Sequence, residues 1–125
     1  MEKVVVEGLA RLPAFSHAAV AGDTIYVSGT LGTLPDTVSL APGGAGPETT
    51  QTLKNLEAIL RECGASMSDV VKVNVYLSDL DTINEMNDAY LEVFQESPPA
   101  RITLGGVDLA LGAAVEMECI AHKPI

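Results

Sequence analysis

Two segments that alternate between apolar and polar residues, 69–77 (DVVKVNVYL) and 114–122 (AVEMECIAH), constrain the fold most strongly. A β-strand points successive side chains to opposite faces of its sheet, so alternation predicts a strand with one buried and one open face. The apolar faces are formed by Val71, Val73, Val75 and Leu77, and by Val115, Met117, Cys119 and Ala121. Other elements of the chain must therefore cover one face of a sheet.

Two segments with helical spacing can supply that cover. Residues 47–63 begin with a proline, carry one stripe of leucine and isoleucine, and are followed by Gly64 as a stop signal. A second helix is predicted from about Thr82 to Phe94, with Asp81 as its cap. Its expected buried stripe is Ile83, Met86, Tyr90, Val93 and Phe94.

The remaining strands are predicted at 2–7, 17–30 and 101–104, with a hairpin turn at Gly22-Asp23 in the second. Residues 31–46 are rich in glycine and proline and indicate a long surface loop. No linker or break in composition interrupts the order β-β-β-α-β-α-β-β. The expectation is a single domain over residues 1–125, an α+β sandwich of one sheet with two helices on one face.

The charge of the chain argues against nucleic acid and membranes as partners. Seventeen acidic and seven basic residues give a net charge of −10. The basic residues are scattered, whereas binding to phosphates requires a basic patch, and anionic membranes are disfavoured for the same reason. No apolar stretch approaches the roughly 20 residues that span a bilayer, and the start of the sequence has no leader pattern. A cytoplasmic protein is therefore predicted.

The apolar content predicts self-association. The mean hydropathy is +0.26, which is high for a small soluble monomer, and such an excess commonly covers a subunit interface. Cys63 and Cys119 lie far apart and fit no metal or redox spacing, so they are expected to be reduced structural thiols. His17 and His122 are not spaced as a metal-binding pair either.

Arg101 stands out because it follows Pro98-Pro99-Ala100, which favours an extended entry into a strand. A planar guanidinium presented in this way suits a carboxylate ligand. The sequence also allows an internal ion pair with one of the many acidic residues, and the residue pattern alone favours this second interpretation.

Glu116 and Glu118 share one face of the last predicted strand with Ile120. Strand pattern alone favours two acids that point outward to solvent. The alternative is that one of them positions a water molecule beside the ligand of the arginine. Ser28-Gly29 lacks the flanking residues of a nucleophile elbow and is expected to offer hydroxyl and N–H groups to a site or a turn. Asn87, which lies among acidic residues on the second helix, is most simply interpreted as a solvated side chain.

Four segments together carry a family resemblance: AGDTIYVSGT, TLKNLEAILRECGASMSDVVKVNVYLSDL, MNDAYLEVF and PPARITL followed by GAAVEMECIA. They resemble the Rid family of reactive intermediate deaminases, also called the YjgF family, over about Phe15 to Ala121. The most specific part is PAR, followed fifteen residues after its arginine by Glu-x-Glu-x-Ile-Ala.

The resemblance implies a chorismate-mutase-like fold assembled as a homotrimer, with three sites in the clefts between subunits. It implies hydrolysis of 2-imino acids to 2-oxo acids and ammonia, with no metal or organic cofactor. In that picture Arg101 grips the substrate carboxylate and Glu116 lies near the attacking water. The pocket-lining positions are Ser28, Gly29, Asn87 and Thr103.

Three positions depart from the usual family pattern. Phe15 replaces a tyrosine of the pocket, His17 replaces a glutamine, and Thr103 stands where many deaminases have a cysteine. The phenol hydroxyl that Phe15 lacks affects which substrates the site can accept. Since 2-aminomuconate deaminases also belong to the family, a deaminase of another substrate is an alternative. Two further alternatives are a non-catalytic trimer that binds small carboxylic metabolites, and a ribonuclease or chaperone-like role that the acidic charge opposes.

Overall fold

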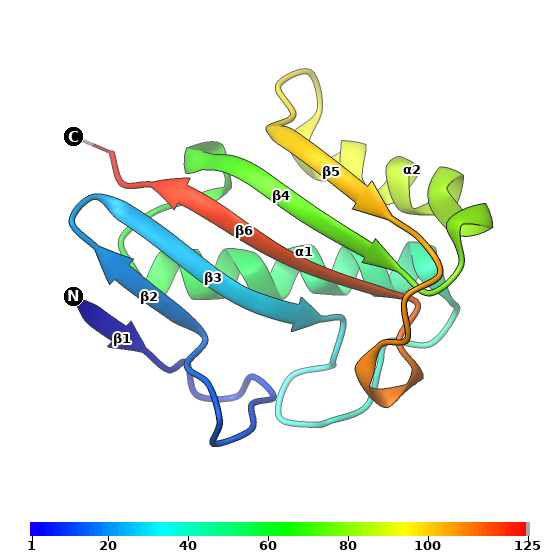
Figure 1. The fold of residues 1–125 in the computed structure, drawn as a ribbon, viewed down its shortest axis with the longest axis horizontal. Coiled ribbons are helices and arrows are strands. Elements are labelled where there is room, and N and C mark those ends of the chain that lie inside the picture. Colours follow the sequence, from blue (N-terminus) through cyan, green and yellow to red (C-terminus); the bar gives the residue numbers. More distant parts are fainter. Residues whose placement is uncertain (125) are drawn as a thin grey trace.

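One mixed sheet of six strands forms the centre of the computed structural model, which describes residues 1–124 (Figure 1). Its neighbours run β1-β2-β3-β6-β4-β5, and every adjacent pair is antiparallel except β4 with β5. The strands are β1 (Glu2–Val4), β2 (Ala18–Ala21), β3 (Thr24–Leu31), β4 (Val70–Leu77), β5 (Ala100–Leu104) and β6 (Val115–His122).

Helices α1 (Ala45–Glu62) and α2 (Ile83–Phe94) both lie on one face of this sheet, and the other face is open (Figure 1). Short 3₁₀ turns stand at Met67–Asp69, Leu80–Thr82 and Ala110–Gly112. The predicted α+β class, the sheet and the two helices on one face are confirmed. Neither helix has the length and apolar character that a membrane span requires.

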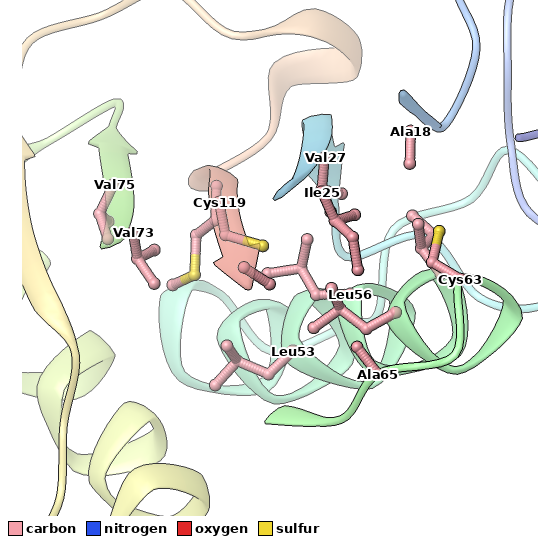
Figure 2. Packing of buried hydrophobic residues seen from close by; sticks show 14 of the residues in the cluster. Ala18, Ile25, Val27, Leu53, Leu56, Cys63, Ala65, Val73, Val75 and Cys119 are labelled. Carbon is pink, nitrogen blue, oxygen red and sulfur yellow. The ribbon is translucent and has the colours of Figure 1, made fainter. Parts of the chain in front are cut away.

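The core lies between the helices and the inner face of the sheet, where α1 packs beneath the central strands (Figure 2). The predicted stripe of α1 consists of Leu53, Leu56, Ile59 and Leu60, which are all buried. The apolar residues of the inner face of β6 are buried too, so both patterns are confirmed. Cys63 ends α1, Cys119 lies on β6, and both are buried free thiols. The two cysteines are thus structural, as predicted.

Local geometry overturns three details of the sequence prediction. Val71 is 52% exposed, because the register with β6 shifts between Val70 and Lys72. Val93 is exposed on α2 rather than part of its buried stripe. Asp81 does not cap α2: a 3₁₀ turn precedes the helix, and the carboxylate of Asp79 accepts the N–H of Asp81 at 2.9 Å.

The first predicted strand is also shorter than expected, because β1 ends at Val4 and the chain continues as an irregular segment to β2. His17 fastens this segment to the sheet. Its buried ring accepts the N–H of Val6 at Nδ1 over 2.9 Å, and its Nε2 contacts the carbonyl oxygen of Ala10 at 3.0 Å. Since a carbonyl only accepts, the ring is the tautomer protonated at Nε2. Both ring nitrogens therefore serve the fold.

Candidate active site

A cavity of about 330 Å³ opens at one end of the sheet, where three irregular segments meet. The segments are the stretch before β2, the loop after β3 and the 3₁₀ turn before β6, which lie along one margin of the molecule (Figure 1). Part of the lining comes from α1 and from the end of β3. The cavity residues used below are Leu9, Arg11, Leu12, Phe15, Gly29, Val38, Ile59, Ala110, Leu111 and Glu116.

Asn55 of α1 holds one wall of the cavity in place. Its buried amide nitrogen donates to the carbonyl oxygens of Leu31 and Thr33, both at 3.0 Å, where the chain leaves β3. The buried carboxylate of Glu48 accepts the N–H of Ala114 at 2.9 Å, which fixes the segment that leads into β6. These contacts anchor the loop after β3 and the start of β6 to α1.

Glu116 lies at the start of β6, on the open face of the sheet, since it follows the buried Val115 and pairs with Tyr76 and Leu31 on the neighbouring strands. Its carboxylate occupies the space where a side chain at Gly29 would stand: a Cβ on Gly29 would collide with Oε2. The absent side chain of Gly29 therefore makes room for this carboxylate beside the cavity.

The two carboxylates of β6 differ in their surroundings. Glu118 accepts hydrogen bonds at one oxygen, Oε1, from the amide of Asn74 at 3.0 Å and the hydroxyl of Tyr76 at 2.7 Å. The hydrogen bond between the Tyr76 hydroxyl and Glu118 raises the pKa of the Tyr76 phenol. Glu116 has no hydrogen-bond partner within residues 1–124, and burial, with a contribution from the charge of Glu118, raises the pKa of its carboxyl. Of the two, Glu116 is the carboxylate free to act as a base.

Phe15 and Ser28 lie next to this site. Phe15 lines the cavity, and the ring is partly exposed. The hydroxyl of Ser28 donates to the carbonyl of Ser16 at 2.6 Å, and its N–H donates to the carbonyl of His17 at 2.9 Å. Ser28 thus fastens the segment that carries Phe15. Phe15, Gly29 and Glu116 are brought together around the cavity, with Ser28 adjacent.

Arg101 lies on the other side of the sheet. It pairs with the buried Val73, so its side chain points toward the helices. Its guanidinium carbon is 4.9 Å from the ring centroid of Tyr90, and Nη1 is 3.8 Å from the sulfur of Met86. A cation over an aromatic face is favourable, and apart from the Nη1–sulfur contact it leaves the guanidinium N–H groups available. In residues 1–124 the one ion pair joins Arg61 to Glu57, so the predicted internal ion pair of Arg101 is absent there.

One chain does not bring Arg101 and Glu116 together. They stand on opposite faces of the sheet, and β4 lies between their strands. Thr103 is on the same side of β5 as Arg101, opposite Val75, and Asn87 follows Met86 on α2. The predicted residues thus form two groups: Phe15, Ser28, Gly29 and Glu116 at the cavity, and Asn87, Arg101 and Thr103 at the β5 edge.

Two features of these groups had no clear signal in the sequence. Tyr90 was predicted as core, but its ring also supports Arg101, and its buried hydroxyl has no partner among the described residues. Burial raises the pKa of this hydroxyl to about 12. The apolar lining from Leu9, Leu12, Val38 and Leu111 comes from irregular segments, where no periodicity marks a residue.

A metal cluster is not part of this arrangement, since the described residues contain no group of three or more His, Cys, Asp or Glu side chains placed to hold an ion. The arrangement does contain an available carboxylate beside a small apolar cavity, and an arginine that has no acidic partner among residues 1–124. These groups can activate water and bind a carboxylate, respectively.

Comparison with known proteins identifies the family of this chain. The family profile described as Endoribonuclease L-PSP matches residues 7–123. This chain belongs to the L-PSP family, which includes the YjgF, RidA and RutC proteins. The resemblance to the Rid family is therefore confirmed.

The L-PSP relatives match nearly the whole chain. A RutC family protein of Pyrococcus abyssi is 41% identical over 109 residues, which are 87% of this chain and 86% of that protein. A protein of Rattus norvegicus named 2-iminobutanoate/2-iminopropanoate deaminase is 39% identical over 112 residues, 90% of this chain and 82% of its own. The crystal structure of the YjgF gene product from E. coli superposes with a TM-score of 0.92 at 26% identity, covering 99% of this chain and 100% of that one. The chorismate-mutase-like fold that the resemblance implied is thereby confirmed.

Proposed function

We propose that this protein is a deaminase that hydrolyses 2-imino acids to 2-oxo acids and ammonia. The observation that carries the proposal is the Glu116 carboxylate, half-buried and without a hydrogen-bond partner in residues 1–124, at the rim of a small cavity. The 2-iminobutanoate/2-iminopropanoate deaminases at 39% identity support the reaction type.

The reaction requires one water and one proton relay. Glu116 accepts a proton from water as the oxygen attacks the imine carbon, the C=N π electrons move to nitrogen, and Glu116 returns the proton to that nitrogen. In the resulting carbinolamine, Glu116 then carries the hydroxyl proton to the amino nitrogen, so that the C=O bond forms, the C–N bond breaks and ammonia leaves the 2-oxo acid. An imine carbon is already electrophilic, so the protein mainly has to hold substrate and water in place, and positioning can supply a large part of the rate.

The substrate carboxylate needs a cation that one chain does not place beside Glu116. We infer that Arg101 of a neighbouring copy supplies it and that the protein assembles as a homotrimer with sites between subunits. The half-buried Arg101 and the exposed apolar side chains of the open face, Tyr26, Ile102 and Leu104, support this assembly. The attraction between an arginine and a carboxylate is stronger in a site shielded from water than in bulk water.

A non-catalytic trimer that binds small carboxylic acids uses the same Arg101 and is the second candidate. RNA hydrolysis, which the family description names, finds no support in a chain of net charge −10. Catalysis separates the two carboxylate-binding functions, because only a deaminase needs the base at Glu116.

The test is an assay in which an amino-acid oxidase generates 2-imino acids and their disappearance is followed with and without the protein. We expect the protein to accelerate the disappearance of the 2-imino acids, and we expect this activity to survive treatment with EDTA and dialysis. Arg101→Lys keeps the charge but loses the two-pronged geometry and should lose most activity. Arg101→Ala should also weaken 2-oxo acid binding, by about 2–5 kcal/mol.

Two results would contradict the deaminase. Rates no faster than the spontaneous reaction, with 2-oxo acids still bound through Arg101, would favour the binding protein. Activity that EDTA abolishes and a divalent ion restores would refute the mechanism by positioning.

A further inference from the structure

We propose that the cavity beside Glu116 receives the side chain of the 2-imino acid and selects apolar side chains of the leucine, methionine or phenylalanine type. This inference rests on the proposed function, since it assigns the substrate class of the same site.

The lining has the chemistry that such a side chain needs. The cavity is lined from three separate irregular segments by Leu9, Leu12, Val38 and Leu111, and Ile59 of α1 adds to the lining. Leu12, Val38 and Leu111 are exposed. Single exposed apolar residues are common on protein surfaces. Three that line one cavity give it an apolar wall, which favours an apolar ligand.

The size of the cavity fits a side chain larger than methyl. Its volume of about 330 Å³ lies near the lower end of small-molecule pockets, which span roughly 300–1,000 Å³. Water occupies about 30 Å³ per molecule in the liquid, so the cavity has room for about ten waters. A methyl group would leave most of this apolar space to water, whereas an isobutyl, thioether or benzyl group would displace it.

The backbone at Leu111, a lining residue of the cavity, is strained. It adopts φ 61° and ψ 13°, in the left-handed region that leucine rarely occupies. Backbone strain of this kind costs about 1–3 kcal/mol and clusters at ligand-binding positions. The Leu111 side chain is 57% exposed, so packing in the core does not explain a leucine here. The proposal assigns this leucine to contact with the side chain of the substrate.

An acidic substrate side chain fits less well. Arg11 is the one permanent cation among the lining residues, and its Nη1 already donates to the carbonyl oxygens of Leu12 at 3.3 Å and Phe15 at 2.9 Å. A second carboxylate could use only the remaining N–H groups of this guanidinium, and the charge of Glu116, which lines the same cavity, would repel it. The substrate class is therefore apolar.

The test compares 2-imino acids generated from alanine, leucine, methionine, phenylalanine and glutamate. We expect kcat/KM for the leucine- and phenylalanine-derived imines to exceed that for the alanine-derived imine by at least tenfold, the effect of a few buried carbons in a hydrophobic pocket. The glutamate-derived imine should not exceed the alanine-derived one.

Variants locate the selectivity in the cavity. Ala110→Phe, at an exposed position of the lining, should fill it and lower the leucine-to-alanine ratio of kcat/KM by about tenfold. Leu111→Ala should lower the same ratio severalfold. Leu91→Ala, a leucine on α2 that is 48% exposed and outside the lining, is the matched control and should leave the ratio unchanged.

The outcomes separate this inference from the proposed function. Hydrolysis with equal rates across the set, or with a preference for the alanine- or glutamate-derived imine, overturns the inference and leaves the deaminase standing. If no imine is hydrolysed, the deaminase fails, and calorimetry with 4-methyl-2-oxopentanoate and pyruvate decides the cavity assignment. Tighter binding of 4-methyl-2-oxopentanoate by about tenfold supports it, and equal or absent binding overturns it.

Discussion

At the scale of single residues, the position of the Glu116 carboxylate depends on Gly29, which has no side chain. Gly29 →Ala would place a Cβ on Oε2 of Glu116 and should displace the carboxylate while the sheet stays intact. A shift of about 1 Å can cost about 100-fold in rate, so we expect a loss of up to that size with little change in Tm. Steady-state kinetics and thermal unfolding measure the two effects.

Gly46→Ala is the matched control for this substitution. Gly46 lies in the first turn of α1, has no positive φ, and its added Cβ would meet the nearest atom, the carbonyl oxygen of Glu85, at 4.0 Å. Alanine should be neutral there or stabilise the helix by up to about 1 kcal/mol. If both variants keep wild-type kinetics, the carboxylate does not depend on the space at Gly29.

The raised pKa of Glu116 gives a prediction with a definite sign. The folded chain holds this proton more tightly than the unfolded chain, so ionisation of Glu116 lowers the unfolding free energy at pH values above the raised pKa. The penalty fades as the pH falls through that pKa and is absent below the ordinary value of 4.5.

Glu116→Gln removes that charge with almost the same shape. We expect a higher Tm than wild type at neutral pH, an advantage that vanishes near pH 4, and a rate at least about 100-fold lower. Binding of 2-oxo acids should change little. A variant less stable than wild type at neutral pH, or one that loses binding, would make Glu116 a structural partner instead of a base.

At the scale of elements, the segment between β1 and β2 forms one wall of the cavity and depends on His17. His17→Ala removes the partners of the Val6 N–H and the Ala10 carbonyl, and an unsatisfied buried group costs about 1–3 kcal/mol. Urea unfolding should show a loss of that size. His122→Ala, at the exposed end of β6, is the control and should stay within about 0.5 kcal/mol of wild type.

Regular elements were predictable because burial repeats with the period of the backbone. The faces of β6, the stripe of α1 and the hairpin at Gly22 follow from the sequence alone, and the structure confirms them. The exposure of Val71 was not predictable, because a register shift moves a residue to the other face without any mark in its own sequence.

The candidate site was predictable only in part for a related reason. Arg101 and Glu116 attract attention as charges in apolar strands, yet their opposite faces depend on strand order, which sequence periodicity does not specify. The cavity lining comes from irregular segments, where side-chain direction is set by individual contacts such as those of His17 and Asn55. Leu111 carries no sequence signal of its left-handed backbone.

At the scale of the whole molecule, the separation of Arg101 from Glu116 leads to a test by subunit mixing. If each site combines Glu116 of one subunit with Arg101 of the next, a trimer that mixes Arg101→Ala and Glu116→Gln subunits contains one intact site of its three, whichever subunit is in excess. A site built within one chain would never be restored by mixing.

We therefore expect two nearly inactive variants to regain activity when they are unfolded together and refolded, up to about a quarter of the wild-type rate for equal amounts, because about three quarters of the trimers are then mixed. Each variant refolded alone is the control, and sedimentation must show trimers in every sample. Mixed trimers without activity would place the arginine and the glutamate in one chain or exclude one of them from the site. A stable monomer at micromolar concentration would refute the shared site itself, because Arg101 and Glu116 would then remain on opposite faces of a single sheet.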